Sequence, residues 1–328
     1  MSEIAHPAPD GWLKRFFLSL VILALLAGLL LVPWAVCWLT ASGELDQEEV
    51  VARQAQGEFV LFGPGLAQDI MAYKLALYAA VKPEVVVLGS SRAGNVRAAF
   101  FERPFVNMAG AATDLESLRL LVDRMLAVHR PKVVLLGLDF WWLTAGVPAG
   151  RPERIVQPSL LDASTLRAPW RWLVQGRIAP ADMLAPLQHR LRADRYGLEA
   201  QLRDTGYGPD GSLYEGAVLD GRRPAPDHAF ARTLRELESG SGVWAGSLAP
   251  DRERLEAFAE ICCRLRSRGI RTIVFLPPLA TPVLGALADR NGGDAGWLSA
   301  LRQGLLDCGV ESMDFSDPRV YGSGDCEM

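Results

Sequence analysis

The sequence is poor in the residues that recognise nucleic acids or hold metals. Only four of its 34 cationic residues are lysines, scattered at Lys14, Lys74, Lys82 and Lys132, and the formal net charge is -4. A nucleic-acid-binding surface needs clustered positive charge, so we expect neither DNA nor RNA as a partner. The few histidines and cysteines show no spacing typical of a zinc site. We therefore expect no metal and no other cofactor.

Cysteines are also few, five in all, and Cys37 falls within an apolar run. The other four are Cys262, Cys263, Cys308 and Cys326, which could form disulfides in an oxidising compartment, although their spacing does not decide the pairing. Cys262 also continues an apolar helical stripe with residues 255, 258 and 265. A buried free thiol is therefore an alternative of at least equal weight for Cys262.

Charge is absent over one long segment near the N-terminus, from Phe16 to Thr40. As a helix this segment would be about 37 Å long, more than a hydrocarbon core of about 30 Å. A cleaved signal peptide would have a shorter apolar region ending in small residues, whereas Trp34 and Trp38 stand here. Basic residues precede the segment and acidic residues follow it, which predicts a cytoplasmic N-terminus. We expect a single-pass protein of the inner (cytoplasmic) membrane, with its main domain extracytoplasmic, in the periplasm of a Gram-negative cell.

The chain divides into four parts on this interpretation. Residues 1–15 form a cytoplasmic N-terminus, 16–40 a transmembrane helix, and 41–83 a helical linker with the first helix of the domain. Residues 84–328 form an α/β domain that carries an insertion at about 144–248, where prolines and glycines break the pattern. Within the insertion only short helices are expected, such as one from Pro180 to Arg195.

Two periods of apolar residues alternate after residue 84. Residues 84–89, 132–138 and 271–276 are short, apolar and rich in β-branched side chains, as strands buried on both faces are; 104–106 and 311–315 are shorter strand candidates. Thr113 and Glu116 form a predicted capping box before one helical stripe, and a second helix runs from near Pro250 to Gly269. The alternation predicts a doubly wound α/β fold with a five-stranded parallel sheet in the order 2-1-3-4-5.

Three polar segments follow the strands of this predicted sheet. They are Leu88-Gly-Ser-Ser-Arg92, Asn107-Met-Ala-Gly110 and Gly137-Leu-Asp-Phe140. Functional groups of open α/β sheets gather beyond the carboxyl ends of the strands. We therefore expect Ser91, Gly110 and Asp139 to meet at one edge of the sheet.

Together these segments resemble the sequence blocks of the SGNH hydrolase superfamily, whose fold is flavodoxin-like. The N-terminal span, the GSSR turn and the GLD segment are most similar to membrane-anchored members associated with O-acylation of exopolysaccharides or cell walls. The resemblance implies that Ser91 is the nucleophile and that the amides of Ser91 and Gly110 form the oxyanion hole. Asp139 stands where the family has Asn, which is a departure because a carboxylate donates no hydrogen bond unless it is protonated.

Simpler roles remain open for these residues. The Gly89-Ser90-Ser91 turn would equally suit a strand-to-helix connection with a serine as N-cap. Asp139 is an alternative N-cap, or a salt-bridge partner of Arg92.

A general base is difficult to find in the sequence. The sequence has four histidines, namely His6, which precedes the span, and His129, His189 and His228, which follow it. The family carries Asp-x-x-His after the last strand, but Asp317 and Asp325 have no histidine three residues on. We therefore expect that the sequence is truncated at Met328 and that this 328-residue form has no esterase activity toward p-nitrophenyl acetate. Ser91-dependent hydrolysis would instead point to His228 as the base.

The resemblance implies acyl transfer, with acetyl the favoured group, or esterase chemistry on an exopolysaccharide or cell-wall polymer, beside an integral membrane O-acyltransferase. The main alternative is a catalytically inactive, membrane-tethered partner of that acyltransferase. A third hypothesis is a carbohydrate-binding module, in which exposed aromatic side chains stack on sugar rings. The candidates for this stacking are Phe140, Trp141, Trp142, Trp170 and Trp172.

Overall fold

The computed structural model describes residues 10–66, 69–144, 158–188, 190–224, 227–245, 249–290 and 296–322. The α-helices are α1 (Asp10–Ala41), α2 (Gln47–Ala55), α3 (Ile70–Val81), α4 (Leu115–Val128), α5 (Ala163–Val174), α6 (Leu198–Arg203), α7 (Gly216–Leu219), α8 (Ala231–Ser239), α9 (Arg252–Ser267), α10 (Thr281–Arg290) and α11 (Gly296–Asp307). The strands are β1 (Leu61–Phe62), β2 (Val85–Gly89), β3 (Phe105–Asn107), β4 (Val133–Gly137), β5 (Arg195–Tyr196), β6 (Thr205–Tyr207), β7 (Leu213–Glu215), β8 (Arg271–Leu276) and β9 (Ser312–Asp314). Short 3-10 helices include η1 (Ser91–Ala93), η2 (Ala98–Phe100), η3 (Phe140–Trp142), η4 (Asp182–Leu184), η5 (His228–Phe230), η6 (Gly242–Trp244) and η7 (Pro318–Tyr321).

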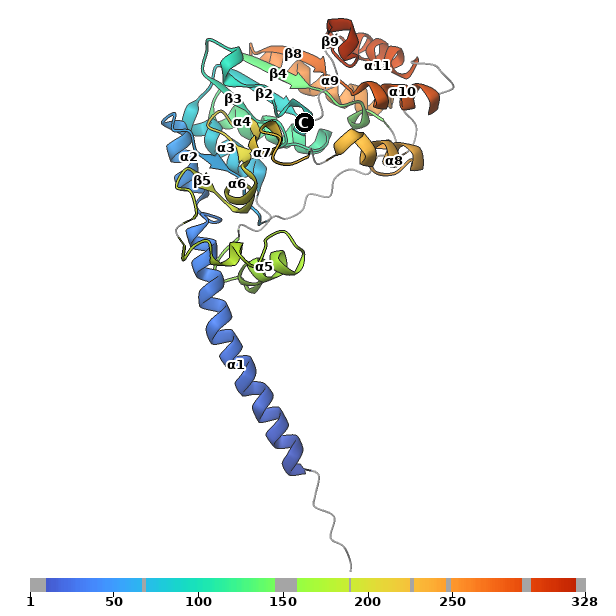
Figure 1. The fold of residues 1–328 in the computed structure, drawn as a ribbon. Coiled ribbons are helices and arrows are strands. Elements are labelled where there is room, and N and C mark those ends of the chain that lie inside the picture. Colours follow the sequence, from blue (N-terminus) through green and yellow to red (C-terminus); the bar gives the residue numbers. More distant parts are fainter. Residues whose placement is uncertain are drawn as a thin grey trace, which may run out of the picture.

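A five-stranded, all-parallel sheet organises the domain, in the order β3-β2-β4-β8-β9. Numbered within this sheet, the order is 2-1-3-4-5, so the predicted topology is confirmed (Figure 1). The register places Gly89 of β2 opposite Gly137 of β4. The carboxyl ends of these two neighbouring strands therefore finish level with each other.

The central strands β2 and β4 are buried on both faces, as their continuous apolar residues predict, whereas β8 and β9 are only partly buried. Alternate side chains of the central strands, such as Val86 and Val134, join the main core beneath α3, α4 and α9. Their neighbours Val85 and Val87 face a smaller core closed by residues of the η1–η2 segment. Connections thus cover both faces, which makes the α/β sheet doubly wound.

Helix boundaries agree with the sequence pattern, with one shift. α9 begins after the N-cap Asp251, and Gly269 follows its end with φ +74°. The capping box of α4 is one residue later than predicted: Asp114, not Thr113, accepts from the Ser117 amide. The Asp114 carboxylate thus takes the place of the predicted Thr113 hydroxyl, and the Ser117 hydroxyl accepts from the Asp114 amide in return.

A second, four-stranded mixed sheet in the order β5-β1-β6-β7 was not predicted. β1 comes from the linker that follows α1, whereas β5, β6 and β7 come from the insertion, so these two segments fold together. The predicted helix from Pro180 to Arg195 is wrong for the described residues. They form η4, turns and β5 instead, because Pro186 has no amide to continue a helix.

The apolar segment near the N-terminus forms one continuous helix, α1, that projects from the rest of the molecule (Figure 1). Among the described residues it alone is long and apolar enough to cross a membrane, which suits a membrane anchor or a signal sequence. Its side chains from Phe16 to Val32 are largely exposed, but Ala35, Trp38 and Leu39 are fully buried. The last turns of α1 therefore pack against the domain.

The described cysteines Cys37, Cys262, Cys263 and Cys308 are free thiols, while Cys326 lies outside the described residues. Cys262 is buried within α9, where burial raises the pKa of its thiol to about 12. This confirms the alternative of a buried free thiol at that position.

Candidate functional site at the carboxyl edge of the parallel sheet

Ser91, Gly110 and Asp139 each follow a neighbouring strand of the parallel sheet, after β2, β3 and β4 respectively. The Gly110 amide donates to the Gly89 carbonyl at 2.9 Å, which joins the loop after β3 to the end of β2. Arg92, the neighbour of Ser91, forms an ion pair with Asp139. The structure thus brings the three predicted segments to one edge of the sheet.

Ser91 opens the short helix η1 and is exposed to solvent. The cap of this turn is the preceding residue, because the Ser90 hydroxyl accepts from the Arg92 amide at 3.2 Å. The Ser91 carbonyl accepts from the Gly94 amide, and this bond fixes the turn. The Ser91 hydroxyl is consequently not needed as a cap, and Ser91 is accessible, as a nucleophile must be.

Gly110 adopts a φ of +82°, which a residue with a Cβ rarely accepts. Its amide is occupied by the Gly89 carbonyl in this conformation. To donate to an oxyanion, the amide would have to exchange that partner. The backbone of this loop therefore serves first to join β3 to β2.

The Arg92–Asp139 pair lies at the centre of this edge. Asp139 is fully buried, and Arg92 Nη1 lies 2.5 Å from its Oδ1. Arg92 also donates to the carbonyls of Pro277 and Pro278, and its guanidinium lies 5.5 Å from the ring centroid of Trp141. Burial raises the pKa of Asp139, while the positive charge of Arg92 opposes the rise. Of the two simpler roles considered for Asp139, the structure shows the salt bridge and no side-chain cap.

Asn107 organises the edge through contacts that were not predicted from the sequence. The side chain is fully buried at the end of β3, and its Nδ2 donates to the carbonyls of Ala93, Gly94 and Val96 in the turn that follows Ser91. Its Oδ1 accepts from the Ala109 amide at 2.8 Å. One amide side chain thus fixes the Ser91 turn to the Gly110 loop. An asparagine that directly follows an apolar strand was the signal available in the sequence.

The insertion also reaches this edge, through the loop between β6 and β7. The Asp210 carbonyl accepts from the Asn107 amide at 2.7 Å, and the Leu213 amide donates to the Gly94 carbonyl at 2.9 Å. The Tyr207 hydroxyl would lie 3.9 Å from a Cβ built on Gly110. The insertion is therefore part of the site's wall and does not form a separate lobe.

Lys74 of α3 is fully buried beneath this loop. Its Nζ donates to the carbonyls of Asn107 and Gly211 and lies 4.1 Å from the ring centroid of Tyr207. Burial lowers the pKa of Lys74 to about 7, although the negative charge of Asp210 favours the protonated form. A buried lysine at this position connects the insertion to the Asn107 backbone.

The histidines are distributed as follows. His129 follows α4 near the amino-terminal end of β4, opposite the edge that carries Ser91, and its Nε2 hydrogen-bonds with the Pro83 carbonyl at 3.1 Å. His129 is therefore a hydrogen-bonded structural imidazole. His228 is exposed within η5, while His6 and His189 lie outside the described residues. Asp317 caps η7 and pairs with Arg319, and Asp325 lies outside the described residues.

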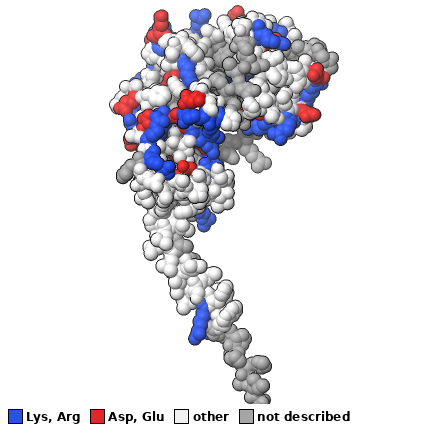
Figure 2. Space-filling model, in the orientation of Figure 1, with Lys and Arg blue, Asp and Glu red and all other residues white. Residues whose placement is uncertain are grey.

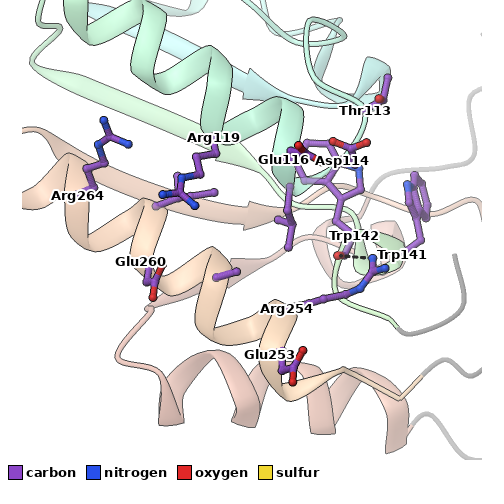
Figure 3. Close-up of a pocket in the computed structure, with 13 residues that line it drawn as sticks. Thr113, Asp114, Glu116, Arg119, Trp141, Trp142, Glu253, Arg254, Glu260 and Arg264 are labelled. Atoms are coloured by element: carbon purple, nitrogen blue, oxygen red, sulfur yellow. Dashed lines mark hydrogen bonds between the residues drawn. The ribbon is translucent and has the colours of Figure 1, made fainter. Parts of the chain in front are cut away.

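A cavity of about 500 Å³ lies beside Trp141 (Figure 3). It lies between the start of α4, η3 and α9, and its wall combines Trp141, Trp142 and Ile261 with charged side chains such as Arg119 and Glu260. Of the aromatic residues considered for sugar stacking, Phe140, Trp142 and Trp172 are buried, whereas Trp141 and Trp170 are partly exposed. Most of that set is therefore core, and only Trp141 lines the cavity as an accessible ring.

Comparisons with protein-family models, with curated proteins and with solved structures find no match to this chain.

Proposed function

We propose that this chain is a membrane-anchored, extracytoplasmic SGNH-like protein that takes part in acyl transfer to an exopolysaccharide or cell-wall polymer, with Ser91 as the nucleophile. The observation that carries the proposal is the meeting of the Ser91 turn, the Gly110 loop and Asp139 at one edge of a sheet with the 2-1-3-4-5 order. This juxtaposition depends on residues distant in sequence, so a solitary serine turn does not account for it.

In the proposed reaction the Ser91 hydroxyl attacks the carbonyl of an acyl donor, and the donor's leaving group departs with the serine proton to leave an acyl-serine. A hydroxyl of the polymer then attacks the acyl-serine, takes the acyl group and returns a proton to Ser91, and backbone amides stabilise the oxyanion in both steps. The exposure of Ser91 and the fixed geometry of its turn support this role. The proton of the hydroxyl needs a base. Among the described residues His228 is the remaining imidazole for that role, because His129 belongs to the opposite end of the sheet.

The Arg92–Asp139 pair would hold the turn that carries Ser91 in place. Arg92 adjoins Ser91 and is held by Asp139 and by the carbonyls of Pro277 and Pro278. These contacts fix the residue next to the nucleophile relative to β4 and to the loop after β8. In this proposal Asp139 replaces the family's asparagine as an anchor and does not replace it as an oxyanion donor.

A second function is favoured by the partners of the same groups. The Gly110 amide is bound to Gly89, and Asp139 is bound to Arg92. Both groups are thereby engaged in holding the fold together. This supports a catalytically inactive partner of an integral membrane O-acyltransferase, in which the SGNH-like edge has become a rigid docking scaffold.

A fluorophosphonate probe distinguishes the two functions. Native membranes that contain the whole protein are treated with the probe, and the modified peptide is identified by mass spectrometry. Acyl transfer through Ser91 predicts a label at Ser91 that Ser91→Ala removes and that Ser239→Ala, at another exposed serine, leaves unchanged. Absence of label from correctly folded protein would contradict the nucleophile and favour the partner.

A further inference from the structure

One part of the insertion lies beside the apolar helix α1, away from the parallel sheet. We call this part the insertion foot and define it as residues 159–175 and 182–188. It contains α5 and η4, and Figure 1 shows α5 next to the last turns of α1. Trp172 and Ala168 of α5 are fully buried in one cluster with Trp38 and Leu39 of α1. The foot is thus attached firmly to the end of the apolar helix.

The outer surface of the foot carries exposed apolar side chains. Leu161 is 98% exposed, Val174 is 88% exposed and Leu187 is 64% exposed. Apolar side chains exposed to this degree on one part of the fold suit a surface that meets a partner or a membrane.

The position of Leu187 indicates that this surface meets a membrane. Pro186 and Leu187 line a crevice of about 280 Å³ together with Leu29, Leu30 and Pro33 of α1. Leu187 therefore lies at the level of α1 residues that belong to the charge-free apolar run. If that run lies in a membrane, Leu187 lies at the same depth.

The length of α1 supports this depth. Because Trp38 and Leu39 are buried against the foot, α1 has lipid on all its sides only up to about Pro33. From Phe16 to Pro33 it would be about 27 Å long, slightly less than a hydrocarbon core of about 30 Å. The foot must then lie at the boundary between hydrocarbon and headgroups.

The side chains at this level suit that boundary. The rings of Trp34 and Trp170 lie 5.4 Å apart and both are partly exposed, as tryptophans of membrane interfaces are. Arg167 and Arg171 are exposed on α5 and form no ion pair with the described residues. Their guanidinium groups are available for lipid phosphates, while the uncharged surface of α1 continues up to the domain (Figure 2).

We propose that the insertion foot is a second membrane contact, a monotopic surface that inserts Leu187 and neighbouring apolar side chains into the leaflet at the carboxyl end of α1. The two contacts together would fix the orientation of the domain relative to the bilayer. A single helix alone could change its tilt in the bilayer and carry the domain with it. The inference rests on α1 being a membrane anchor, as the proposed function requires.

The test is photo-cross-linking of the full chain in phosphatidylglycerol–phosphatidylethanolamine vesicles. Leu187→benzoylphenylalanine and Val174→benzoylphenylalanine place a reactive ketone on the foot without altering the native cysteines. The control is Leu306→benzoylphenylalanine, because Leu306 is similarly exposed, at 57%, but lies on α11 at the far side of the domain from α1. After irradiation, lipid adducts on the protein are measured by mass spectrometry.

Several-fold more lipid adduct at positions 187 and 174 than at 306 is expected. If the chain stays in the vesicles through an alkaline carbonate wash but lipid adduct at position 187 is no higher than at 306, the proposed membrane contact of the foot is wrong and α1 is still an anchor. Cross-links at 187 to a second copy of the chain in place of lipid would overturn it too. Chain that the wash removes from the vesicles would contradict the anchor itself, and with it the proposed function.

Discussion

Asn107 is the residue on which the geometry of the candidate site depends most. Its side chain is fully buried, and its four hydrogen bonds connect the turn after β2 to the loop after β3. Buried networks of this kind are costly to break, because each abandoned partner is left without a hydrogen bond.

Asn107→Ala should therefore lower the free energy of unfolding by about 2–4 kcal/mol, since several buried backbone groups lose their partner. Chemical denaturation of the detergent-solubilised chain measures this loss. Asn95→Ala is the matched control, because Asn95 lies in the same connection and its side chain forms no hydrogen bond with the described residues. Equal stability of the two variants would show that Asn107 does not hold the edge together.

The Arg92–Asp139 pair gives a prediction with a built-in rescue. Arg92→Met leaves the fully buried Asp139 without its cation and should cost about 3–5 kcal/mol at neutral pH. Adding Asp139→Asn removes the buried charge, so the double variant should be more stable than Arg92→Met alone. Because burial already raises the pKa of Asp139, the cost of Arg92→Met should also shrink as the pH falls and the carboxylate becomes protonated. A double variant no more stable than the single one contradicts this account of the pair.

Lys74 makes stability depend on pH in a defined window. Its pKa is lowered to about 7 by burial, whereas that of an unfolded lysine is about 10.4. The unfolded chain therefore binds more protons between these values, and the stability of the folded state rises with pH across that window and is lost as the pH falls toward 7. Thermal unfolding at pH 7 and pH 9, followed by tryptophan fluorescence, should show a smaller rise for Lys74→Met than for the unaltered chain. An identical rise in both would exclude Lys74 as its source.

At the scale of elements, the loop between β6 and β7 carries the contact between the insertion and the parallel sheet. Gly211 has a φ of +73°, and a Cβ there would lie 2.5 Å from the Asn107 carbonyl oxygen. Gly309, after α11, has nearly the same φ, +69°, but open space around it. The two glycines differ in what a side chain would meet and hardly in backbone strain.

Gly211→Ala should consequently be more destabilising than Gly309→Ala by about 1–3 kcal/mol, the usual cost of forcing extra atoms into a packed site. Chemical denaturation of both variants provides the comparison. Similar losses would mean that the loop moves away from Asn107 without penalty and that its contact with the site is weak.

The parallel strands were predictable because their burial on both faces leaves an uninterrupted apolar signal, as in Val85–Leu88. The strands of the second sheet, two or three residues long, carry no such signal. β1, Leu61–Phe62, pairs with β5 and β6 more than 130 residues later in the chain. Asn107 and Lys74 were missed for a related reason. Asn107 is visible in the sequence as a polar residue directly after an apolar strand, but the backbone carbonyls that Asn107 and Lys74 bind are brought close only by tertiary folding.

At the scale of the whole molecule, Glu44 connects the apolar helix to the domain. Its buried carboxylate accepts from the amides of Gly65, Leu66 and Leu198, which belong to the linker and to the insertion. The end of α1, the second sheet and the insertion foot thereby form one continuous base beneath the parallel sheet (Figure 1). The site edge is attached to this base through Asn107 and the β6–β7 loop, so its height above a membrane would be set by the fold.

The central claim is that Ser91 is the nucleophile of acyl transfer to an extracytoplasmic polymer. The most direct measurement is the acetate released by mild alkali from the cell-envelope polysaccharide of three strains, which carry the unaltered chain, Ser91→Ala or a deletion. The account predicts that Ser91→Ala loses as much ester-linked acetate as the deletion, while the variant protein remains in the membrane at the normal level. Unchanged acetate with Ser91→Ala, together with loss in the deletion, would contradict the nucleophile and leave the chain as a partner of the acyltransferase.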